Sequence, residues 1–534
     1  MSREFASNRT APGSAYTLAP VSALAAEDQR LAVIDLGSNS FRLVVFTAHD
    51  GWWRRTDEIY EAVRIGEGLA ATGRLGEEGM ARAQATMEVF AHFCRASGLK
   101  DDEVDAVATS AIRDATNASD FLERAEEASG LRVRVLSREE EARYGYLAAV
   151  NSTTLSDGVM LDLGGGSMQL VRVESRHARQ LESWPLGAVR MTERFLAEDK
   201  PAKPRQLREL RTFVSGALAS APWLKRSGDR IVGIGGTVRN LAAAAQRAAG
   251  IPEFGVQGFV LTRDALDALV DDLAALPPSE RGRVPGIKES RADLILAGAL
   301  VVRTVLEEAG FEAIEVTEAG LREGVFFERY LRHNGDPPLF DDVRQATVVN
   351  LAAQYGMDPR ANAHTAHVAK LALELFDELA AAGLHPGDPL ERELVWASSA
   401  LHDIGMTVDY DDHHKHSRYL VLNAGLPGFS QREMALIGQA VRYHRKGMPS
   451  LGPFARLAEK GDEDRLARMS ALLRLGEDLE RSRDQEVRAA HVALSDGTVR
   501  LGLESDSDVR VARWAASREV DLFDRAFGRP LEVS

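Results

Sequence analysis

One eleven-residue pattern occurs twice in this chain and limits the fold more than any other feature of the sequence. Residues 35–45 and 162–172 are identical at six of eleven positions and share the pattern Asp-Leu-Gly-x-x-Ser-x-x-Leu-Val. In each copy an apolar run precedes the Asp, which predicts a buried strand, a four-residue turn and a second strand. A repeat of this kind, 127 residues apart, predicts two similar α/β halves whose turns face a shared cleft.

Strands and helices alternate around the two hairpins, as expected for two lobes of an α/β fold. In the first lobe, residues 29–150, the predicted elements are helices at about 77–97, about 119–129 and from Arg138, with strands at 104–109 and 131–136. In the second lobe, residues 151–333, they are a strand at 231–234, a Gly-Gly-Thr turn that opens a helix, a strand at 314–316, and helices at 292–308 and about 321–332.

The composition changes after residue 333. A linker rich in Pro, Gly and Asp at 333–338 precedes a helical region, where eight of the 13 histidines lie between His364 and His444. The last 45 residues predict short strands. We therefore expect a helical domain at 334–488 and a small β-containing element at 489–534. Residues 1–28 are rich in Ala, Ser, Pro and Thr and lack the apolar core of a signal peptide, so we expect a flexible tail.

Charge and composition exclude several classes of protein. The formal net charge is −15, which disfavours a protein that holds nucleic acid over its whole surface. The single cysteine, Cys94, excludes an intrachain disulfide and a zinc site built on thiolates. No stretch approaches the ~18 apolar residues that a membrane span needs. We expect a cytoplasmic protein with no membrane and no nucleic-acid partner.

Three glycine-rich turns suit a phosphate group, because convergent backbone N–H groups bind anions and glycine admits close approach. They are Gly37-Ser38-Asn39-Ser40, Gly164-Gly165-Gly166-Ser167 and Gly235-Gly236-Thr237, the last at a helix N-terminus. Asp162 precedes the second turn and could hold Mg²⁺. A single turn of this type is usually only a tight hairpin, but three such turns favour a phosphate site.

Two charged residues are candidates for chemistry on a phosphate. Arg113 follows a strand and could clamp phosphate oxygens, although an isolated arginine is more often an ordinary surface residue. Ser137 and Glu140 form a capping box at the start of a helix, which explains Glu140 structurally. Glu141 remains free to deprotonate an attacking water.

These stretches together resemble the exopolyphosphatase and guanosine pentaphosphate phosphohydrolase (Ppx/GppA) family, a branch of the acetate-kinase, sugar-kinase and actin-like superfamily. The matching segments lie in the family's order, at 33–41, 109–117, 140–143, 161–167, 235–237, 291–299 and 320–324. The resemblance implies two actin-like lobes with a cleft. It implies hydrolysis of terminal phosphoanhydride bonds of polyphosphate, or of the 5′ γ-phosphate of guanosine pentaphosphate, with Mg²⁺ or Mn²⁺.

The resemblance also assigns roles to residues. Glu141 would be the general base, with Arg113 beside it, and Asp162 and Asp35 would lie at the metal. The remaining expected phosphate-binding residues are Ser38, Asn39, Ser40, Arg42, Gly164, Gly165, Gly166, Ser167, Gly235, Gly236 and Thr237. Two positions depart from the family. Gln169 stands where a Glu is common, which leaves one carboxylate fewer near the metal, and Gln257 replaces a frequent His.

The helical region resembles the domain related to HD phosphohydrolases in longer family members. His364, His402, Asp403 and Glu477 fall at the positions of its metal ligands, with Glu477 in place of the usual Asp. A second divalent ion could therefore bind here, and the alternative is a set of buried histidines within a helical bundle. In the family this domain is thought to bind substrate and mediate dimerisation, so the resemblance implies a homodimer.

Several functional hypotheses remain open on the sequence alone. The leading one is an exopolyphosphatase, with guanosine pentaphosphate hydrolysis as a second activity of the same site. Gln169 favours an alternative, a weakly catalytic regulator that binds the alarmones guanosine penta- and tetraphosphate. An ATP-dependent kinase has no sequence support. The basic runs at 413–418 and 442–446 could contact polyphosphate or form a solvated face.

Overall fold

The two copies of the repeat form the first hairpins of two separate sheets. The computed structural model describes residues 29–49 and 51–534. In it β1 (Gln29–Leu36) pairs antiparallel with β2 (Phe41–His49), and β6 (Gly158–Leu163) pairs in the same way with β7 (Met168–Glu174). Asp35 lies opposite Arg42 and Asp162 opposite Gln169, so the two aspartates occupy equivalent places.

The first lobe is a five-stranded sheet with the order β3-β2-β1-β4-β5. Its remaining strands are β3 (Trp52–Glu61), β4 (Val104–Ala108) and β5 (Val133–Val135), and its outer helices are α1 (Leu69–Thr72), α2 (Glu77–Ala96), α3 (Ser110–Arg113) and α4 (Ala118–Ser129). Residues of β1 alternate between two cores: Ile34 packs with α2 and α4, whereas Val33 faces the opposite side. This alternation is what a strand covered on both faces requires.

The second lobe is a six-stranded sheet with the order β10-β11-β9-β6-β7-β8. Its other strands are β8 (His177–Trp184), β9 (Ile231–Ile234), β10 (Phe259–Thr262) and β11 (Ala313–Val316). Its helices are α6 (Ala188–Phe195), α7 (Pro204–Leu218), α8 (Gly236–Ala248), α9 (Arg263–Ala275), α10 (Pro278–Arg281) and α11 (Ile295–Ala309). Helix α11 begins three residues later than expected, after a 3₁₀ turn at 289–291 and a further turn at 292–294.

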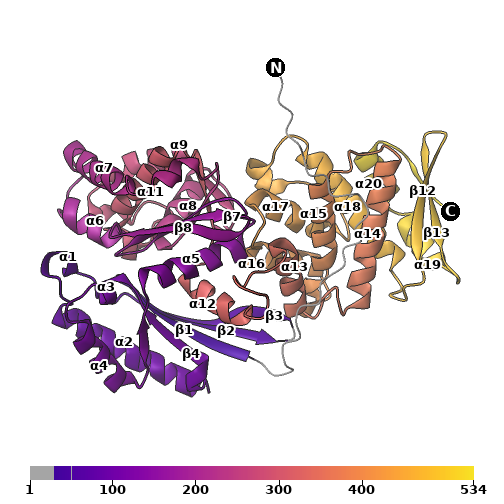
Figure 1. Cartoon of the computed structure of the whole chain (residues 1–534). Helices are drawn as coiled ribbons and strands as arrows, with labels where there is room; N and C mark the ends of the chain where they lie inside the picture. The colour runs from indigo at the N-terminus through magenta and orange to yellow at the C-terminus, as the bar shows by residue number, and fades with distance from the viewer. Residues whose placement is uncertain (1–28, 50) are drawn as a thin grey trace.

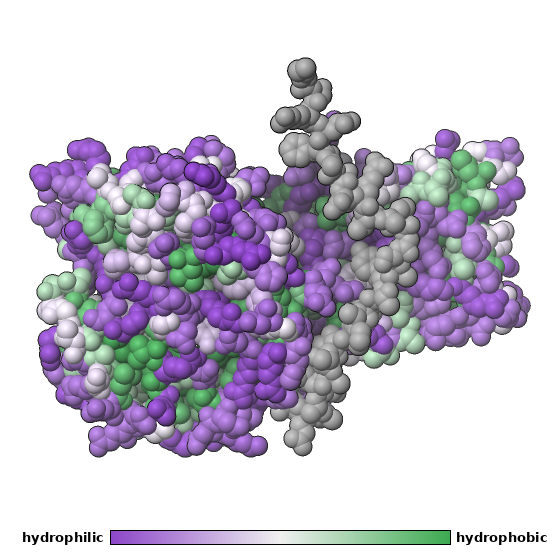
Figure 2. Space-filling model, in the orientation of Figure 1, coloured by the Kyte–Doolittle hydropathy of each residue, from purple (hydrophilic) through white to green (hydrophobic). Residues whose placement is uncertain are grey.

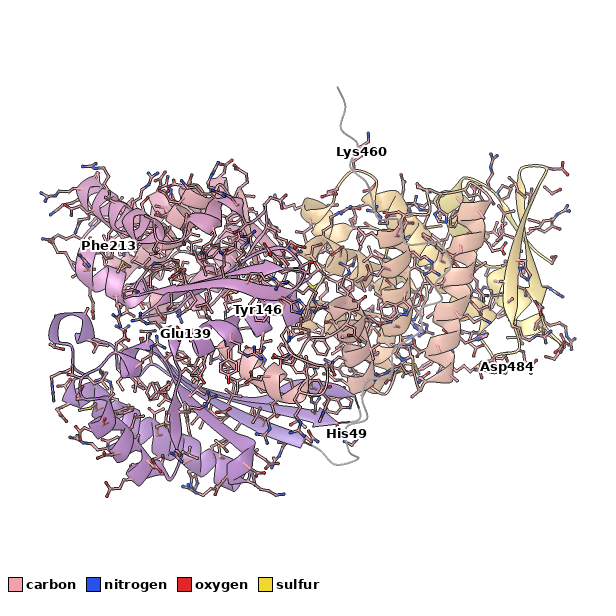
Figure 3. The ribbon with its side chains drawn as sticks, viewed as in Figure 1. His49, Glu139, Tyr146, Phe213, Lys460 and Asp484 are labelled. Atoms are coloured by element: carbon pink, nitrogen blue, oxygen red, sulfur yellow. The ribbon has the colours of Figure 1, made fainter. Side chains whose placement is uncertain are left out.

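Two helices lie between the sheets and hold the lobes together. They are α5 (Arg138–Ser152) and α12 (Leu321–Tyr330), and they share one core with apolar residues of both sheets. A Cβ on Gly324 would lie 2.0 Å from the carbonyl oxygen of Tyr144, so glycine is what lets the two helices approach this closely. Figure 3 labels Glu139 and Tyr146 on α5, which runs along the junction of the lobes.

The helical domain sits against one end of both lobes (Figure 1). Its helices are α13 (Val343–Gln354), α14 (Ala363–Ala381), α15 (Pro389–Leu401), α16 (His413–Ala424), α17 (Gln431–Tyr443) and α18 (Asp462–Leu479). The backbone N–H of Trp53 donates to Asn350 at 2.7 Å, and Gln354 donates to the carbonyl of Trp53 at 3.1 Å. Helix α13 is thereby joined to β3 of the first lobe.

The C-terminal segment contains helices that the sequence did not predict. Beside β12 (Ala489–Ser495), β13 (Thr498–Glu504) and β14 (Leu531–Val533) lie α19 (Arg510–Ala516) and α20 (Val520–Phe527). Phe523 is buried in the same core as the helical domain, and Arg474 pairs with Glu519 at 2.8 Å. These helices therefore extend the core of the helical domain.

Hydrophilic side chains cover most of the visible face in Figure 2, and the apolar residues form the cores named above. Among the described residues, no helix combines the length and apolar character that would let it cross a bilayer. The tail expected at residues 1–28 lies outside the described residues.

Candidate active site

A polar cavity of about 120 Å³ lies between the lobes, where the turns of both hairpins meet. Asp35 and Asp162 both line it, so the two aspartates of the repeat face one space. The other expected residues that line the cavity are Ser38, Asn39, Ser40, Arg42, Glu141, Gly164, Gly165, Ser167, Gly235 and Gly236. The duplicated hairpins thus bring residues more than a hundred positions apart into one site.

The two hairpin turns have the same backbone closure. Gly37 N–H donates to the carbonyl of Ser40 at 3.2 Å, and Gly164 N–H donates to that of Ser167 at 3.0 Å. The turns also approach each other closely. A Cβ on Gly166 would lie 2.4 Å from Oγ of Ser110 and 2.8 Å from Oγ of Ser38, so any side chain there would displace these hydroxyl groups.

The third turn opens helix α8. Gly235 has a φ of +97°, a conformation that glycine adopts without strain. A Cβ on Gly236 would lie 2.3 Å from Nη2 of Arg291, so the missing side chain lets this guanidinium lie against the start of the helix. Free N–H groups and the helix dipole favour an anion at this point, and Arg291 adds a positive charge.

Glu141 is buried, with 6% of its surface exposed, and it is held from two sides. Nη1 of Arg113 donates to Oε2 at 2.7 Å, and Oγ of Ser167 donates to Oε1 at 3.1 Å. Gln169 donates in turn to Oγ of Ser167 at 2.9 Å. The carboxylate therefore has a fixed orientation at the cavity wall. Gln169 contributes through Ser167 and is absent from the cavity lining.

The three carboxyl groups repel one another in a buried space. Burial, followed by the charges of Glu141 and Asp35, raises the pKa of Asp162 to about 7. Burial also raises the pKa of Asp35, opposed by the charges of Arg322 and Arg42. A hard divalent cation would relieve this repulsion, and carboxylate oxygens are the ligands it prefers. The residues present therefore fit a magnesium or manganese ion.

Four arginines line the cavity: Arg42, Arg239, Arg291 and Arg322. Burial, followed by the charges of Arg322 and Arg42, lowers the pKa of Arg239 to about 10, and burial also lowers that of Arg291. Such a cluster is costly without a counter-ion, and a bound polyanion supplies one. Only Arg42 was expected from the sequence. Arg239 lies two residues after the Gly-Gly-Thr turn, and Arg291 and Arg322 belong to segments that match the family pattern.

Three expected residues lie elsewhere than predicted. Arg113 does not line the cavity and instead pairs with Glu141. Gly166 packs against Ser110 and Ser38 behind the turn. Thr237 is the second residue of α8, and its side chain faces the neighbouring helix α11. A Cβ on Gly298 of α11 would lie 2.4 Å from Cγ2 of Thr237.

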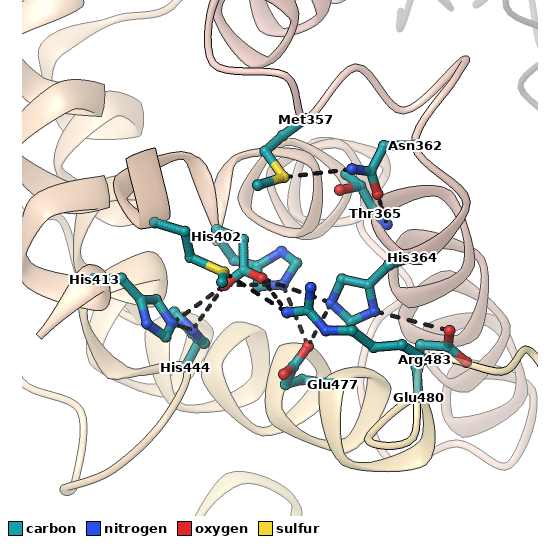
Figure 4. Close-up of polar contacts among 12 residues, drawn as sticks. Met357, Asn362, His364, Thr365, His402, His413, His444, Glu477, Glu480 and Arg483 are labelled. Atoms are coloured by element: carbon teal, nitrogen blue, oxygen red, sulfur yellow. Dashed lines mark hydrogen bonds and ion pairs between the residues drawn. The ribbon is translucent and has the colours of Figure 1, made fainter. Parts of the chain in front are cut away.

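The expected metal-binding residues of the helical domain also come together (Figure 4). Nε2 of His364 and Nε2 of His402 lie 3.1 Å and 3.3 Å from Oε2 of Glu477, and both histidines approach Asp403 within 3.7 Å. His413 joins the cluster from the run at 413–418, with its Nε2 3.2 Å from Oδ1 of Asp403. That run is therefore not a fully solvated face.

Sequence profiles of known families match most of the chain. The profile of the Ppx/GppA phosphatase family matches residues 44–333, and that of Ppx/GppA phosphatase domain III matches residues 343–520. A guanosine-5′-triphosphate,3′-diphosphate pyrophosphatase of Vibrio vulnificus is 30% identical over 430 residues, which cover 79% of this chain and 81% of the relative. The corresponding protein of Vibrio parahaemolyticus is also 30% identical, with the same coverage.

Solved structures match more than half of this chain. The Ppx/GppA family member of Aquifex aeolicus is 32% identical, with a TM-score of 0.50, and the match covers 58% of this chain and all of that one. An exopolyphosphatase of Cytophaga hutchinsonii matches with a TM-score of 0.52, 57% coverage of this chain and 98% of that one, at 24% identity. At that identity the second match supports the fold alone, which is the two-lobed α/β fold expected from the repeat.

Proposed function

The chain belongs to the Ppx/GppA phosphatase family and is a phosphoanhydride hydrolase, and from this premise we propose that it is an exopolyphosphatase that releases orthophosphate from the end of inorganic polyphosphate. One observation carries the proposal: a single cavity contains the glycine-rich turns, four arginines and a buried, oriented carboxylate. The same site would act on guanosine pentaphosphate as a second substrate.

The terminal phosphate would be bound by the turns and the arginines. Residues of the two hairpin turns and of the α8 start line the cavity, and Arg291 lies at that start. Guanidinium groups hold phosphate oxygens with two parallel hydrogen bonds, which fixes both position and orientation. We assign the turn residues, including Ser38, Asn39 and Gly165, and the four arginines to substrate binding.

Glu141 would act as the general base. A water molecule beside its carboxylate attacks the terminal phosphorus, a new P–O bond forms, and the bond to the bridging oxygen breaks. The proton of the water passes to Glu141, and the shortened polyphosphate leaves with the bridging oxygen. Arg113 and Ser167 would be positioning residues, because they fix the carboxylate through hydrogen bonds of 2.7 Å and 3.1 Å.

Asp35 and Asp162 would hold Mg²⁺ or Mn²⁺ in the cleft. When bound, such an ion neutralises charge on the phosphate oxygens in phosphoryl transfer. Burial, followed by the charges of Glu141 and Asp35, raises the pKa of Asp162, and a cation bound there would favour the ionised carboxylate.

The alternative of a weakly catalytic alarmone-binding regulator was based on Gln169. In the structure Gln169 supports the proposed base, because its amide donates to Ser167, which donates to Glu141. This arrangement favours catalysis. The relatives from Vibrio are named for guanosine pentaphosphate. Hydrolysis of polyphosphate and of guanosine pentaphosphate should therefore be compared directly.

We further propose the domain division and the assembly. The lobes would span 29–150 and 151–333, the helical domain 334–488 and a C-terminal element 489–534. The homodimer implied by the family resemblance is part of the same proposal, and sedimentation analysis of the full chain would test it.

Phosphate release from long-chain polyphosphate and from guanosine pentaphosphate by the same preparation tests the function. We expect Glu141→Gln to lower both rates by about 10²-fold or more, the lower end of the contribution of a general base. Glu139→Gln is the matched control, because Glu139 is exposed in the same helical turn. Tight guanosine pentaphosphate binding with no phosphate release from either substrate would instead establish the regulator.

A further inference from the structure

A second cavity, of about 300 Å³, borders the same hairpin turn as the phosphate cavity. Ser38 and Asn39 line both cavities. The two spaces also meet at Gly165, which lines the phosphate cavity and whose carbonyl accepts a hydrogen bond at 2.8 Å from the backbone N–H of Val189 in the wall of the second cavity. A ligand whose phosphates occupy the first cavity can therefore extend into the second, which is large enough for a small organic group.

The walls of the second cavity do not suit a polyphosphate chain. Its charged lining residues are four acids, Glu67, Glu193, Asp199 and Asp293, and one base, Arg64. The phosphate cavity, by contrast, is lined by four arginines. Carboxylates repel a polyanion and attract groups with N–H donors. The second cavity therefore favours an uncharged part of a substrate over further phosphate units.

Apolar side chains form another part of the wall. Val189 and Leu294 belong to one small buried cluster, and Leu196 and Pro278 also line the cavity. Ligand pockets usually combine apolar walls of this kind with a few polar groups that fix the orientation of the ligand. A flat heterocyclic ring with N–H donors at its edge fits both the apolar and the acidic part of the wall.

The carboxylate of Asp293 is held at one oxygen and free at the other. Nη1 of Arg64 donates to Oδ2 at 3.0 Å, whereas Oδ1 is buried and has no hydrogen-bond partner among the described residues. Arg64 belongs to the first lobe and Asp293 to the second, so this contact orients the carboxylate from across the cleft. Unpartnered buried polar atoms are rare in native proteins, and a ligand that donates to Oδ1 would satisfy this one.

Two more residues that line this cavity have a buried polar atom without a partner in the described part of the chain. They are Asn39, through Nδ2, and Thr192, through Oγ1. Only 6% of Asn39 is exposed. The amide nitrogen of Asn39 donates, the hydroxyl of Thr192 donates or accepts, and the carboxylate of Asp293 accepts. The three atoms therefore call for a ligand that carries both donors and acceptors.

Guanine has the complementary pattern at its base-pairing edge. Its N1–H and its N2 amino group are neighbouring donors, and its O6 beside them is an acceptor. A carboxylate accepts from both donors at once. Adenine instead presents a lone pair at N1, which a carboxylate repels, and its amino group stands where guanine has O6. A carboxylate oriented as in Asp293 therefore selects guanine among the purines.

We propose that this second cavity binds the guanine base of guanosine pentaphosphate, and that Asp293 determines the specificity for it. Asp293 accepts from N1–H and the N2 amino group, and the hydroxyl of Thr192 donates to O6. Asn39, which borders both cavities, donates to the ribose between base and phosphates. The inference rests on the phosphate site proposed above, whereas inorganic polyphosphate has no group that needs this cavity.

Calorimetric binding to the full-length Glu141→Gln protein tests the proposal without hydrolysis of the ligand. The ligands are guanosine pentaphosphate and its inosine and adenosine counterparts, with Mg²⁺ present. Inosine lacks the N2 amino group, so we expect its compound to bind about tenfold more weakly than that of guanosine, and the adenosine compound to bind more weakly still. Equal affinities, or no binding of the three, overturn the inference. Phosphate release from polyphosphate by the wild type reports separately on the proposed function.

Asp293→Asn in the same Glu141→Gln background should exchange the preferred base. Arg64 keeps the amide oxygen as its acceptor, which places the amide nitrogen where Oδ1 was. That nitrogen donates, so guanine binds about tenfold more weakly, whereas the xanthosine compound, which has a carbonyl oxygen at position 2, binds more tightly than in the parent protein. A structural defect would weaken both compounds. An unchanged preference for guanosine over xanthosine therefore refutes the contact.

Asp199→Asn is the matched control for charge. Asp199 lines the same cavity, and its Oδ1 accepts the backbone N–H of Ser279 at 3.1 Å. The substitution removes one negative charge from the cavity, as Asp293→Asn does, and we expect the order guanosine, inosine, adenosine to persist, because exposed charges contribute little. The same reversal toward xanthosine in Asp199→Asn would show that the charge of the cavity, and not Asp293, selects the base.

Discussion

Nη1 of Arg113 lies 2.7 Å from Oε2 of Glu141 and 2.9 Å from the carbonyl oxygen of Leu136, and Arg113 does not line the cavity that Glu141 faces. The guanidinium is therefore anchored to the backbone and holds the carboxylate from behind. Burial raises the pKa of Glu141, while the charge and hydrogen bond of Arg113 oppose that rise. This contact lowers the pH at which the buried Glu141 becomes a base.

The pH dependence of the hydrolase follows from this contact. Glu141 must be deprotonated to act as the base, and its pKa is raised, so activity falls with decreasing pH at a point above the ordinary value of 4.5. In Arg113→Met the opposing charge is lost, the pKa rises further, and the acidic limb of the kcat/KM profile moves to higher pH. Arg138→Met, an exposed arginine at the start of the same helix, leaves the limb in place. A limb that stays fixed in Arg113→Met would contradict the assignment of Glu141.

The close packing around Gly166 predicts that a larger residue at this position lowers activity. In Gly166→Ala the new methyl group would lie 2.4 Å from Oγ of Ser110 and 2.8 Å from Oγ of Ser38, so these two hydroxyl groups must move. We expect kcat/KM for polyphosphate to fall about tenfold or more, since small displacements at a reacting group are costly. Gly216→Ala in α7 is the control, because its methyl group meets no atom within 4 Å. Removing the obstructing hydroxyl in Gly166→Ala/Ser110→Ala should recover part of the activity.

The sequence predicted those parts of the molecule that rest on local patterns. The repeat predicted both hairpins and placed Asp35 and Asp162 in one space, and the capping box of Ser137 singled out Glu141 from its neighbours. These conclusions need only strand periodicity, turn chemistry and a helix start.

The remainder depends on contacts between distant segments. Arg239, Arg291 and Arg322 come from three separate elements, and nothing near each one shows that they converge. His413 and His444 lie in basic runs, yet packing between α16 and α17 buries them. Thr237 has the residue type of a phosphate ligand, but the direction of its side chain is set by Gly298 on another helix.

The arginine cluster predicts a loss of substrate affinity. Arg291 lies against the start of α8 inside the cavity, and a charged hydrogen bond contributes about 1.5–3 kcal/mol. In Arg291→Met we therefore expect KM for polyphosphate to rise about tenfold or more. The slope of log KM against log salt should also become shallower, because fewer phosphate contacts release counter-ions. Arg283→Met is the control, since the Arg283 side chain is 78% exposed and pairs only loosely with Glu280. An equal effect in both variants would mean that the whole surface charge acts, not this cavity.

Replacing Asp462 should lower the stability of the helical domain. Its carboxylate is fully buried and accepts hydrogen bonds from Arg432, Arg465 and the backbone N–H of Glu459, each at 2.7 Å. Burial alone would raise its pKa, but Arg432 and the other donors hold it below 3.8. We expect Asp462→Asn to cost roughly 3 kcal/mol, because it leaves buried donors without their charged partner.

The pH dependence of that loss gives the sharper test. A lowered carboxyl pKa stabilises the folded state above the unfolded value of 3.8, and the contribution disappears as the pH falls through the folded pKa. The difference in melting temperature between wild type and Asp462→Asn should thus be largest near neutral pH and shrink below about pH 4. Asp464→Asn, two residues away on the exposed side of α18, should melt close to wild type throughout. A difference that persists unchanged at pH 3 would show that the carboxylate charge does not stabilise α18, and that Asp462 acts there only as a hydrogen-bond acceptor.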